Sequence, residues 1–216
     1  MASFTETQTA PGFWDSHILD MLFPPAAPPS SQDRDLLRQF SYLPGLKELL
    51  MLRQVHALEH ATVWMLSREL RRTEDSLSAD NPQLSGISTD RGFYLYGQVA
   101  LEDVARAAQM ALRQITTGDW ELAIHPRCGT NVSVGMLLTA GLTVGAMALL
   151  PRHPLVLLGG LGLAATTATY LTPELGTLAQ RYITTAIPFN LAIVHVIPIS
   201  DLIGRPAHFV QVRWVD

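Results

Sequence analysis

Two uncharged apolar runs, separated by only four residues, limit the fold of this chain more than any other feature of its sequence. Residues 132–150 and 155–171 contain no Asp, Glu, Lys or Arg, and only the segment PRHP divides them. Each run approaches the ~20 residues that a helix needs to cross a hydrocarbon core of ~30 Å. Charged residues make up only 16% of the 216-residue chain. We therefore predict a transmembrane helical hairpin over residues 132–171, with the lipid bilayer as its partner.

Small residues recur along both runs. Gly141 and Gly145 form a GxxxG pair in the first run, and the second run carries Gly159, Gly160, Gly162, Ala164 and Ala165. Small side chains let transmembrane backbones approach closely. The hairpin is therefore expected to pack on itself or on another membrane protein. The formal net charge of −4 gives no basic field, so a nucleic-acid partner is not expected.

The distribution of arginines indicates an orientation. Only Arg152 lies at the tip of the hairpin, whereas Arg113, Arg127 and Arg181 lie near its other ends. Basic residues favour the cytoplasmic side of a membrane. This pattern predicts an integral membrane protein with its soluble part on the cytoplasmic side.

The rest of the chain predicts a small α+β domain at the membrane surface, with a long helix and a short sheet that the hairpin interrupts. Residues 1–32 are rich in proline and small polar residues and are expected to form a disordered tail. Residues 33–131 form the surface domain with the candidate site, residues 132–171 the hairpin, and residues 172–216 the strands that complete the domain.

Sequence periodicity places the elements of this domain. A long helix is expected over 45–72, an amphipathic helix over 100–118, and a β-hairpin around the TDRG segment in 86–97. A short strand is expected over 119–126. The predicted C-terminal strands are NLAIVHVIPIS and AHFVQVRWV, and both are expected to join the same sheet.

The long helix carries the segment HALEH, which brings His56, Glu59 and His60 onto one helix face. Two imidazoles four residues apart suit zinc, and HxxEH is the inverted zincin signature, in which the glutamate acts as general base. Alternatively, both histidines lie in the interior and bind backbone carbonyls.

A second segment, HPRCGT, places His125 and Cys128 at the spacing of a zinc knuckle. Cys128 is the only cysteine of the chain, so an internal disulfide is excluded. Alternatively, Pro126 and Gly129 only shape the entry to the first apolar helix, with Asn131 as its N-cap. Together the two segments predict one metal site, with zinc as the expected ion.

The number of ligands decides what such a site does. If His56, His60, His125 and Cys128 all bind, the site is closed and structural. If three bind, a water occupies the fourth position and Glu59 is placed to accept its proton, which gives metal-assisted hydrolysis. A thiolate ligand makes calcium or magnesium improbable.

The two segments also carry a family resemblance. HALEH and HPRCGTN before an apolar hairpin resemble the HGAEH and HPRCGTS pattern of the YqhQ-like bacterial membrane proteins, which are predicted to be metal-dependent. From residue 45 onward, including GFYLYG, the chain is similar to an uncharacterised membrane-protein family of cyanobacteria and chloroplasts. The resemblance implies the same five site residues, with departures at Ala57, Leu58 and Asn131 that replace no ligand. It also implies a thylakoid membrane as a possible location.

Two functions follow as hypotheses. The first is a metal-binding assembly or quality-control factor for membrane complexes, with photosynthetic complexes implied by the resemblance. The alternative is a membrane-anchored zinc-dependent hydrolase or peptidase with Glu59 as general base. The substitution Glu59→Gln separates them, because an enzyme would keep its metal and lose activity.

Overall fold

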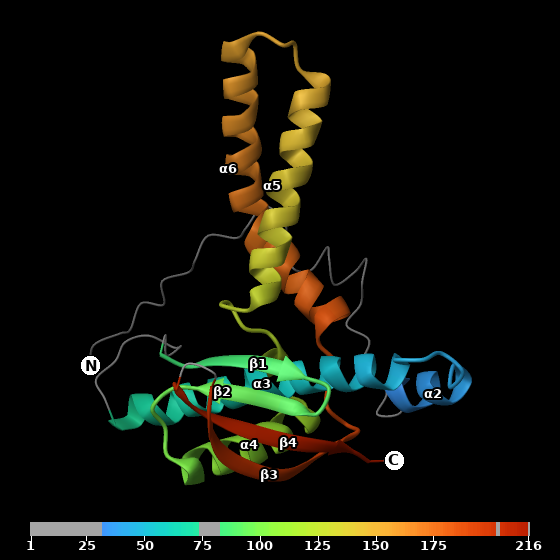
Figure 1. Cartoon of the computed structure of the whole chain (residues 1–216), viewed down its shortest axis with the longest axis vertical. Coiled ribbons are helices and arrows are strands. Elements are labelled where there is room, and N and C mark those ends of the chain that lie inside the picture. The colour runs from blue at the N-terminus through green and yellow to red at the C-terminus, as the bar shows by residue number, and fades with distance from the viewer. Residues whose placement is uncertain (1–31, 74–82, 202–203, 216) are drawn as a thin grey trace, which may run out of the picture.

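The computed structural model describes residues 32–73, 83–201 and 204–215. The predicted tail therefore lies outside the described residues, apart from residue 32. Helices and an antiparallel sheet make up an α+β fold, from which two paired helices project (Figure 1). This arrangement confirms the predicted α+β class and the pairing of two helices in a hairpin.

The long helix of the fold is α3 (Leu46–Thr73), as predicted, and the short helix α2 (Gln32–Gln39) precedes it. Gly45 has a positive φ of 81° and lies directly before α3. Helix α3 is apolar on several sides because it is covered on several sides, and its buried side chains include Val55, Leu58 and Leu66. Most of the elements outside the helical hairpin contact this helix.

Four strands form one antiparallel sheet in the order β1-β2-β4-β3. Their bounds are β1 Ser85–Thr89, β2 Gly92–Tyr96, β3 Leu191–Ser200 and β4 Pro206–Trp214. The first two precede the helical hairpin in the chain and the last two follow it. The predicted β-hairpin and both C-terminal strands are therefore confirmed, and the sheet joins the two ends of the fold.

Helix α4 (Leu101–Thr116) matches the amphipathic helix expected over 100–118. Its apolar face, with Val104, Ala108 and Ile115, is fully buried. This face packs into one core with α3 and with Phe93 of the sheet. The amphipathic periodicity that predicted the helix thus corresponds to a buried face.

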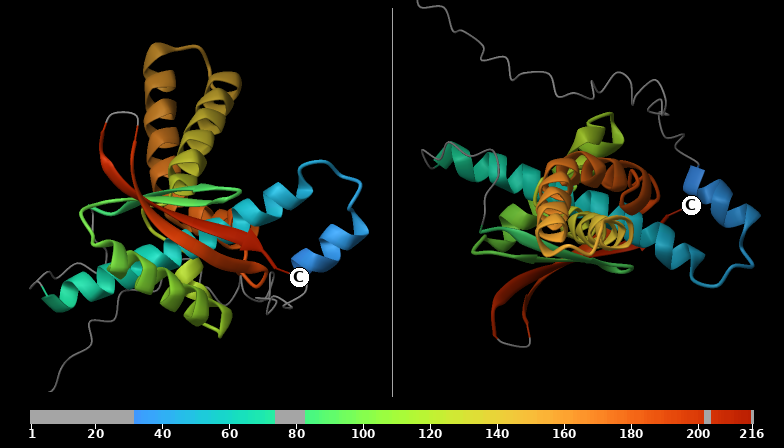
Figure 2. Two further views of the ribbon diagram at one scale, coloured as in Figure 1. Left: turned by 60° about the horizontal axis from the view of Figure 1, so that its bottom comes forward. Right: turned by 90° about the horizontal axis from the view of Figure 1, so that it is seen from above.

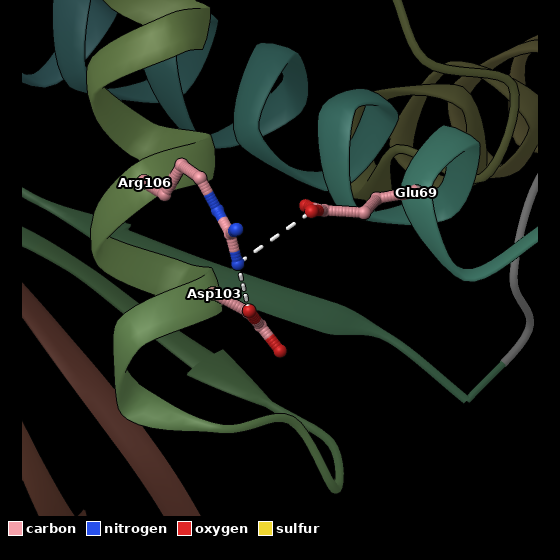
Figure 3. Close-up of polar contacts among 3 residues, drawn as sticks. All are labelled: Glu69, Asp103 and Arg106. Atoms are coloured by element: carbon pink, nitrogen blue, oxygen red, sulfur yellow. Dashed lines mark hydrogen bonds and ion pairs between the residues drawn. The ribbon is translucent and has the colours of Figure 1, made fainter. Parts of the chain in front are cut away.

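Polar contacts join the exposed ends of α3 and α4. Arg106 of α4 lies 3.5 Å from Glu69 of α3 and also bonds Asp103 one turn back (Figure 3). All three side chains are at least 41% exposed, so these pairs contribute at most about 1 kcal/mol each. Apolar burial, rather than this ion pair, holds the two helices together.

The strand predicted over 119–126 is wrong. Residues Trp120–Ala123 form a 3₁₀ helix, η1, because the Leu122 N–H bonds back to the Asp119 carbonyl. Apolar residues in so short a segment suit either structure. The Trp64 indole donates to the Ile124 carbonyl at 2.9 Å and holds the segment against α3.

Helices α5 (Gly129–Leu149) and α6 (Pro154–Ala179) form the hairpin, and a π-helical turn, η2 (Gln180–Thr184), continues α6. Both helices are long and apolar enough to cross a membrane. They extend beyond the apolar runs that predicted them. Cys128, not Asn131, is the N-cap of α5.

Only some small residues lie between the helices of the hairpin. Gly135 lies against Thr172 and Gly176 against Asn131, and Ala164 and Ala168 are buried. Gly160 lies against Leu150, whereas Gly141, Gly145, Gly159 and Gly162 adjoin open space. None of the residues of α5 is buried. Figures 1 and 2 show α5 and α6 projecting together from the sheet and helices, with β1 the strand nearest their base. The predicted GxxxG pair is thus not used inside the hairpin.

Candidate metal centre

The first half of the site lies in the middle of α3. His56 is half-buried, whereas His60 and Glu59 are only 3% and 7% exposed. The imidazole rings of His56 and His60 are neighbours, with centroids 4.4 Å apart. The i, i+4 spacing therefore brings the two rings together, as the sequence predicts.

Backbone carbonyls fix the orientation of both rings. The Nδ1 of His56 donates to the Thr184 carbonyl at 3.0 Å, and the Nδ1 of His60 donates to the Ala123 carbonyl at 2.6 Å. A carbonyl can only accept, so Nδ1 carries the hydrogen and the Nε2 of a neutral ring is left as the ligand atom. Such bonds are characteristic of metal-binding histidines. The interior-histidine and metal-ligand interpretations therefore share the same contacts.

The third ligand comes from the start of α5. Cys128 is 5% exposed, and its Sγ lies 3.3 Å from the Nε2 of His56 and accepts from the Thr130 N–H at 3.4 Å. The ligand atoms of His56, His60 and Cys128 all lie within 4.8 Å of one another. Segments about seventy residues apart in the chain thus meet, as the two sequence segments predict.

The surroundings of Cys128 affect its ionisation. Burial disfavours the thiolate, but the neighbouring His60 and the hydrogen bonds from the Thr130 hydroxyl and amide outweigh this effect. The pKa of the Cys128 thiol is consequently lowered below its usual value. A thiolate is the form that binds a metal ion.

The donor set fits a soft or borderline ion. Zinc–nitrogen and zinc–sulfur bonds of about 2.0–2.3 Å imply tetrahedral ligand separations of roughly 3.3–3.8 Å. The 3.3 Å between Sγ and the His56 Nε2 falls at this value, and 4.8 Å is the upper limit for the set. Two imidazoles and a thiolate suit zinc better than calcium or magnesium. The cluster could therefore hold a metal ion.

His125, the fourth predicted ligand, lies beside the cluster but is not part of it. Its ring is near His60 and Trp64, with centroid distances of 5.6 Å and 5.0 Å. Its Nδ1 accepts from the Arg127 N–H at 3.3 Å. The structure thus brings three of the four predicted ligands within the spacing of a metal site.

Glu59 lines the same space and lies against strand β1. Its Oε2 accepts from the Ser88 hydroxyl at 2.7 Å. Burial raises the pKa of the Glu59 carboxyl above its usual value, although the Ser88 hydrogen bond and the nearby His56 lower it in part. A Cβ added to Gly86 would collide with this carboxylate. The glycine is therefore what lets β1 approach Glu59.

All five predicted site residues line one cavity of about 110 Å³. Its walls come from three elements: helix α3, the start of β1, and the turn that leads into α5. The lining residues are His56, Glu59, His60, Val63, Leu84, Ser85, Gly86, His125, Arg127, Cys128 and Gly129. The cavity therefore places three ligand atoms, a carboxylate and free space together.

A buried amide that sequence reasoning missed supports the turn. Gln180, in the π-helical turn, is fully buried and accepts from the His125 N–H at 2.9 Å. Its Nε2 donates to Asn131 at 2.8 Å, and Asn131 in turn donates to the Pro126 carbonyl at 2.7 Å. Because Gln180 follows an apolar helix and resembles any surface glutamine in the sequence, no local signal identifies it.

The fold and the centre together define a class of protein: an α+β chain with a His/Cys cluster at the base of two paired helices of membrane length. The chain belongs to the DUF6391 family, described as a domain of unknown function, whose model matches residues 51–196. An uncharacterized protein of the cyanobacterium Picosynechococcus sp. (strain ATCC 27264 / PCC 7002 / PR-6) is 48% identical over 204 residues, which cover 94% of this chain and 96% of that protein. No solved structure matches the chain significantly.

Proposed function

We propose that this protein is a membrane-bound, metal-dependent hydrolase, with zinc as the ion and Glu59 as the general base. One observation carries the proposal: His56, His60 and Cys128 offer three ligands, and Glu59 lines the same cavity. Three protein ligands leave a zinc ion one position for water, which is the pattern of catalytic rather than structural sites. A buried carboxylate beside that position supplies the base.

The chemistry requires little of the chain beyond these groups. A zinc ion held by the three ligands would acidify a water molecule and polarise the substrate carbonyl. Glu59 accepts a proton from the water, whose oxygen forms a bond to the carbonyl carbon. The bond from that carbon to the leaving nitrogen or oxygen then breaks, and Glu59 returns the proton to the leaving group. Burial raises the pKa of Glu59, which makes its carboxylate a stronger base for the first transfer.

Helices α5 and α6 support an integral membrane location. Apolar side chains with more than 60% exposure cover α5, among them Val132, Met136 and Leu137. Such a surface is typical of contact with lipid. With the arginine distribution, we place the hairpin in a cytoplasmic or thylakoid membrane and the sheet on its cytoplasmic side.

Metal content and hydrolysis together test the proposal. The wild type, Cys128→Ser and Glu59→Gln, purified in detergent, are analysed by elemental mass spectrometry and assayed on libraries of quenched peptides and chromogenic esters. We expect about one zinc ion per wild-type chain, greatly reduced metal in Cys128→Ser, and unchanged metal without hydrolysis in Glu59→Gln.

Two results would contradict this function. A wild type that binds no metal would contradict the zinc site. The Cys128 thiol beside the His56 imidazole would then be tested as a reactive nucleophile by iodoacetamide labelling. Wild-type hydrolytic activity in Glu59→Gln would show that Glu59 is not the general base.

A structural metal site in an assembly factor for membrane complexes is the second candidate function. His125 lines the cavity and would close the site if it turned toward the cluster. The open space beside Gly141 and Gly145 favours close approach of a helix from another membrane protein. In this case His125→Ala would lose metal as Cys128→Ser does, whereas the hydrolase proposal expects His125→Ala to retain it.

A further inference from the structure

We propose that the outer edge of strand β1 binds an extended peptide main chain to main chain and presents it to the metal centre. The inference rests on the proposed hydrolase function and names its substrate class, a peptide segment close to the membrane. Strand β1 is one edge of the sheet, since the order is β1-β2-β4-β3. Edge strands carry backbone groups that can pair with another chain.

The hydrogen-bond parity of the sheet identifies the outward backbone groups. The Val212 N–H donates to the Arg91 carbonyl. Alternate residues of an antiparallel strand bond the same neighbour, so Phe93 and Leu95 of β2 also direct their backbone groups toward β4. Their partners in β1 are Ser88 and Gly86, which therefore point their own N–H and C=O groups away from β2. Within the described residues, no backbone hydrogen bond outside the sheet reaches these groups.

The sequence of β1 leaves this edge unprotected. Proteins usually block an edge with proline, lysine or a bulge. Strand β3, at the opposite edge, contains Pro198 and an irregularity near Ile193. Strand β1 reads SGIST, without proline or charge, and its pairing with β2 is regular. The unprotected edge is thus the one beside the metal centre.

This edge is continuous with the cavity. Ser85 and Gly86 form part of its wall, and Gly86 brings the strand against the Glu59 carboxylate. A peptide paired with Gly86 and Ser88 would run past Glu59 with alternate carbonyls directed to the strand. Pairing of this kind holds a peptide extended and largely independently of its sequence.

The location of the edge limits the source of the peptide. Figure 1 shows β1 as the strand nearest the base of the hairpin, and Gly129, the first residue of α5, lines the cavity. The cavity therefore lies at the level where the proposed membrane span begins. A peptide there is a segment that enters or leaves the bilayer, rather than a distant soluble loop.

Peptide competition tests the proposal without depending on turnover. The Glu59→Gln variant in nanodiscs is titrated with a fluorescein-labelled hexapeptide of alternating valine and threonine, and anisotropy reports binding. Unlabelled competitors carry one backbone N-methyl group at successive positions. Because every second amide donates to an edge strand, we expect methylation at alternate positions to weaken competition about tenfold and methylation between them to have little effect.

The anchored form of the probe tests the membrane-side location. A palmitoylated hexapeptide should displace the label at an at least about tenfold lower concentration than the free hexapeptide, because the bilayer raises its local concentration. Palmitoyl-glycine is the lipid control and should not compete. Equal competition by palmitoyl-glycine would indicate a lipid site and overturn the proposal, as would a lack of alternation in the N-methyl series.

A matched pair of variants examines the protein side. Ser88→Pro and Ser88→Ala both lose the hydroxyl, but only Ser88→Pro loses the outward N–H, where an edge strand tolerates proline. We expect weakened hexapeptide binding in Ser88→Pro alone, provided that its zinc content and circular dichroism match those of Ser88→Ala. If Ser88→Pro does not fold, the N-methyl series decides alone.

The same titration on metal-free protein separates the two proposals. Alternation that persists without metal or turnover would support the peptide edge even if the hydrolase function fails. Hydrolysis without alternation would leave the hydrolase standing and overturn only the peptide edge.

Discussion

Helix α3 and the helices of the α5–α6 hairpin are all long, yet they differ in composition and in what covers them. Helix α3 buries polar groups such as Gln54, which accepts from the Asn190 N–H at 3.1 Å. No residue of α5 is buried, and none of its residues is charged. Composition therefore already separates the two helices, because α3 carries eight charged residues and α5 carries none. The difference lies in the polar side chains, which α3 can carry because the fold gives them partners.

The two regions meet at the cavity and contribute unequally to it. Helix α3 supplies two imidazoles and the carboxylate, whereas the hairpin contributes Cys128 at the first turn of α5. Helix α3 thus supplies most of the functional groups of the site, and the start of the hairpin supplies the remaining ligand. The following substitutions contrast the two regions, from the largest expected effect to the smallest.

Truncation of a buried leucine should distinguish the regions most strongly. Leu66 of α3 is 1% exposed and Leu137 of α5 is 74% exposed. Leu66→Ala should lower the free energy of unfolding by about 2–5 kcal/mol. Leu137→Ala should change it by less than about 0.5 kcal/mol, because it leaves no cavity. Thermal and denaturant unfolding in one detergent measure both, and similar losses would show that the surface of α5 is covered by protein.

Two glycines provide the next contrast. A methyl group on Gly86 would collide with Glu59, whereas one on Gly141 in α5 would meet open space. Gly86→Ala should lower kcat/KM about tenfold to a hundredfold with metal retained, since a displaced base costs this much in rate. Gly141→Ala should leave kcat/KM unchanged. Equal activity of the two variants would show that catalysis does not depend on the position of Glu59 beside β1.

Sequence patterns predicted most of the fold, because each rests on a local physical cause. The helical period located α3 and α4, the uncharged runs located the hairpin, and strand alternation located the sheet. The η1 segment was predicted wrongly, since Leu122 and Ala123 suit either a strand or a short helix. The predicted sequence limits of the hairpin were also too short, because they stopped where the apolar composition weakened although the backbone remained helical.

The candidate site was predicted less completely than the fold. Spacing identified His56, His60 and Cys128, and the structure brings them together. Spacing also selected His125, but a local contact within its turn directs its Nδ1 to the Arg127 amide, two residues further along the chain. Gln180 and the carbonyl of Thr184 are contributed by a π-helical turn that no sequence pattern announces. The types of the ligands can thus be read from short sequence segments. The orientation of the His56 and His60 rings depends on carbonyl groups that are distant in the sequence.

The buried amide tests how far the hairpin positions the metal ligands. Gln180→Ala would free the His125 amide and Asn131, and so loosen the turn that carries Cys128. Metal affinity should fall about tenfold to a hundredfold, as is usual for supporting residues of metal sites. Gln109 on α4 is exposed, and Gln109→Ala is the control variant, which should keep the metal affinity of the wild type. Competition with a fluorescent zinc chelator measures both, and equal affinities would show that α3 alone orients the site.

The smallest expected effect concerns the Ser88 hydroxyl. Its bond to Glu59 lowers the pKa of that carboxyl, and burial raises it. Ser88→Ala removes the lowering contribution, so the pKa of Glu59 should rise further. The base acts when ionised, and activity is therefore lost as pH falls through this pKa. The acid limb of the kcat/KM profile should move to higher pH in Ser88→Ala, with zinc content and the alkaline limb unchanged. An acid limb that stays in place would assign it to another group and leave Glu59 without a role in the free enzyme.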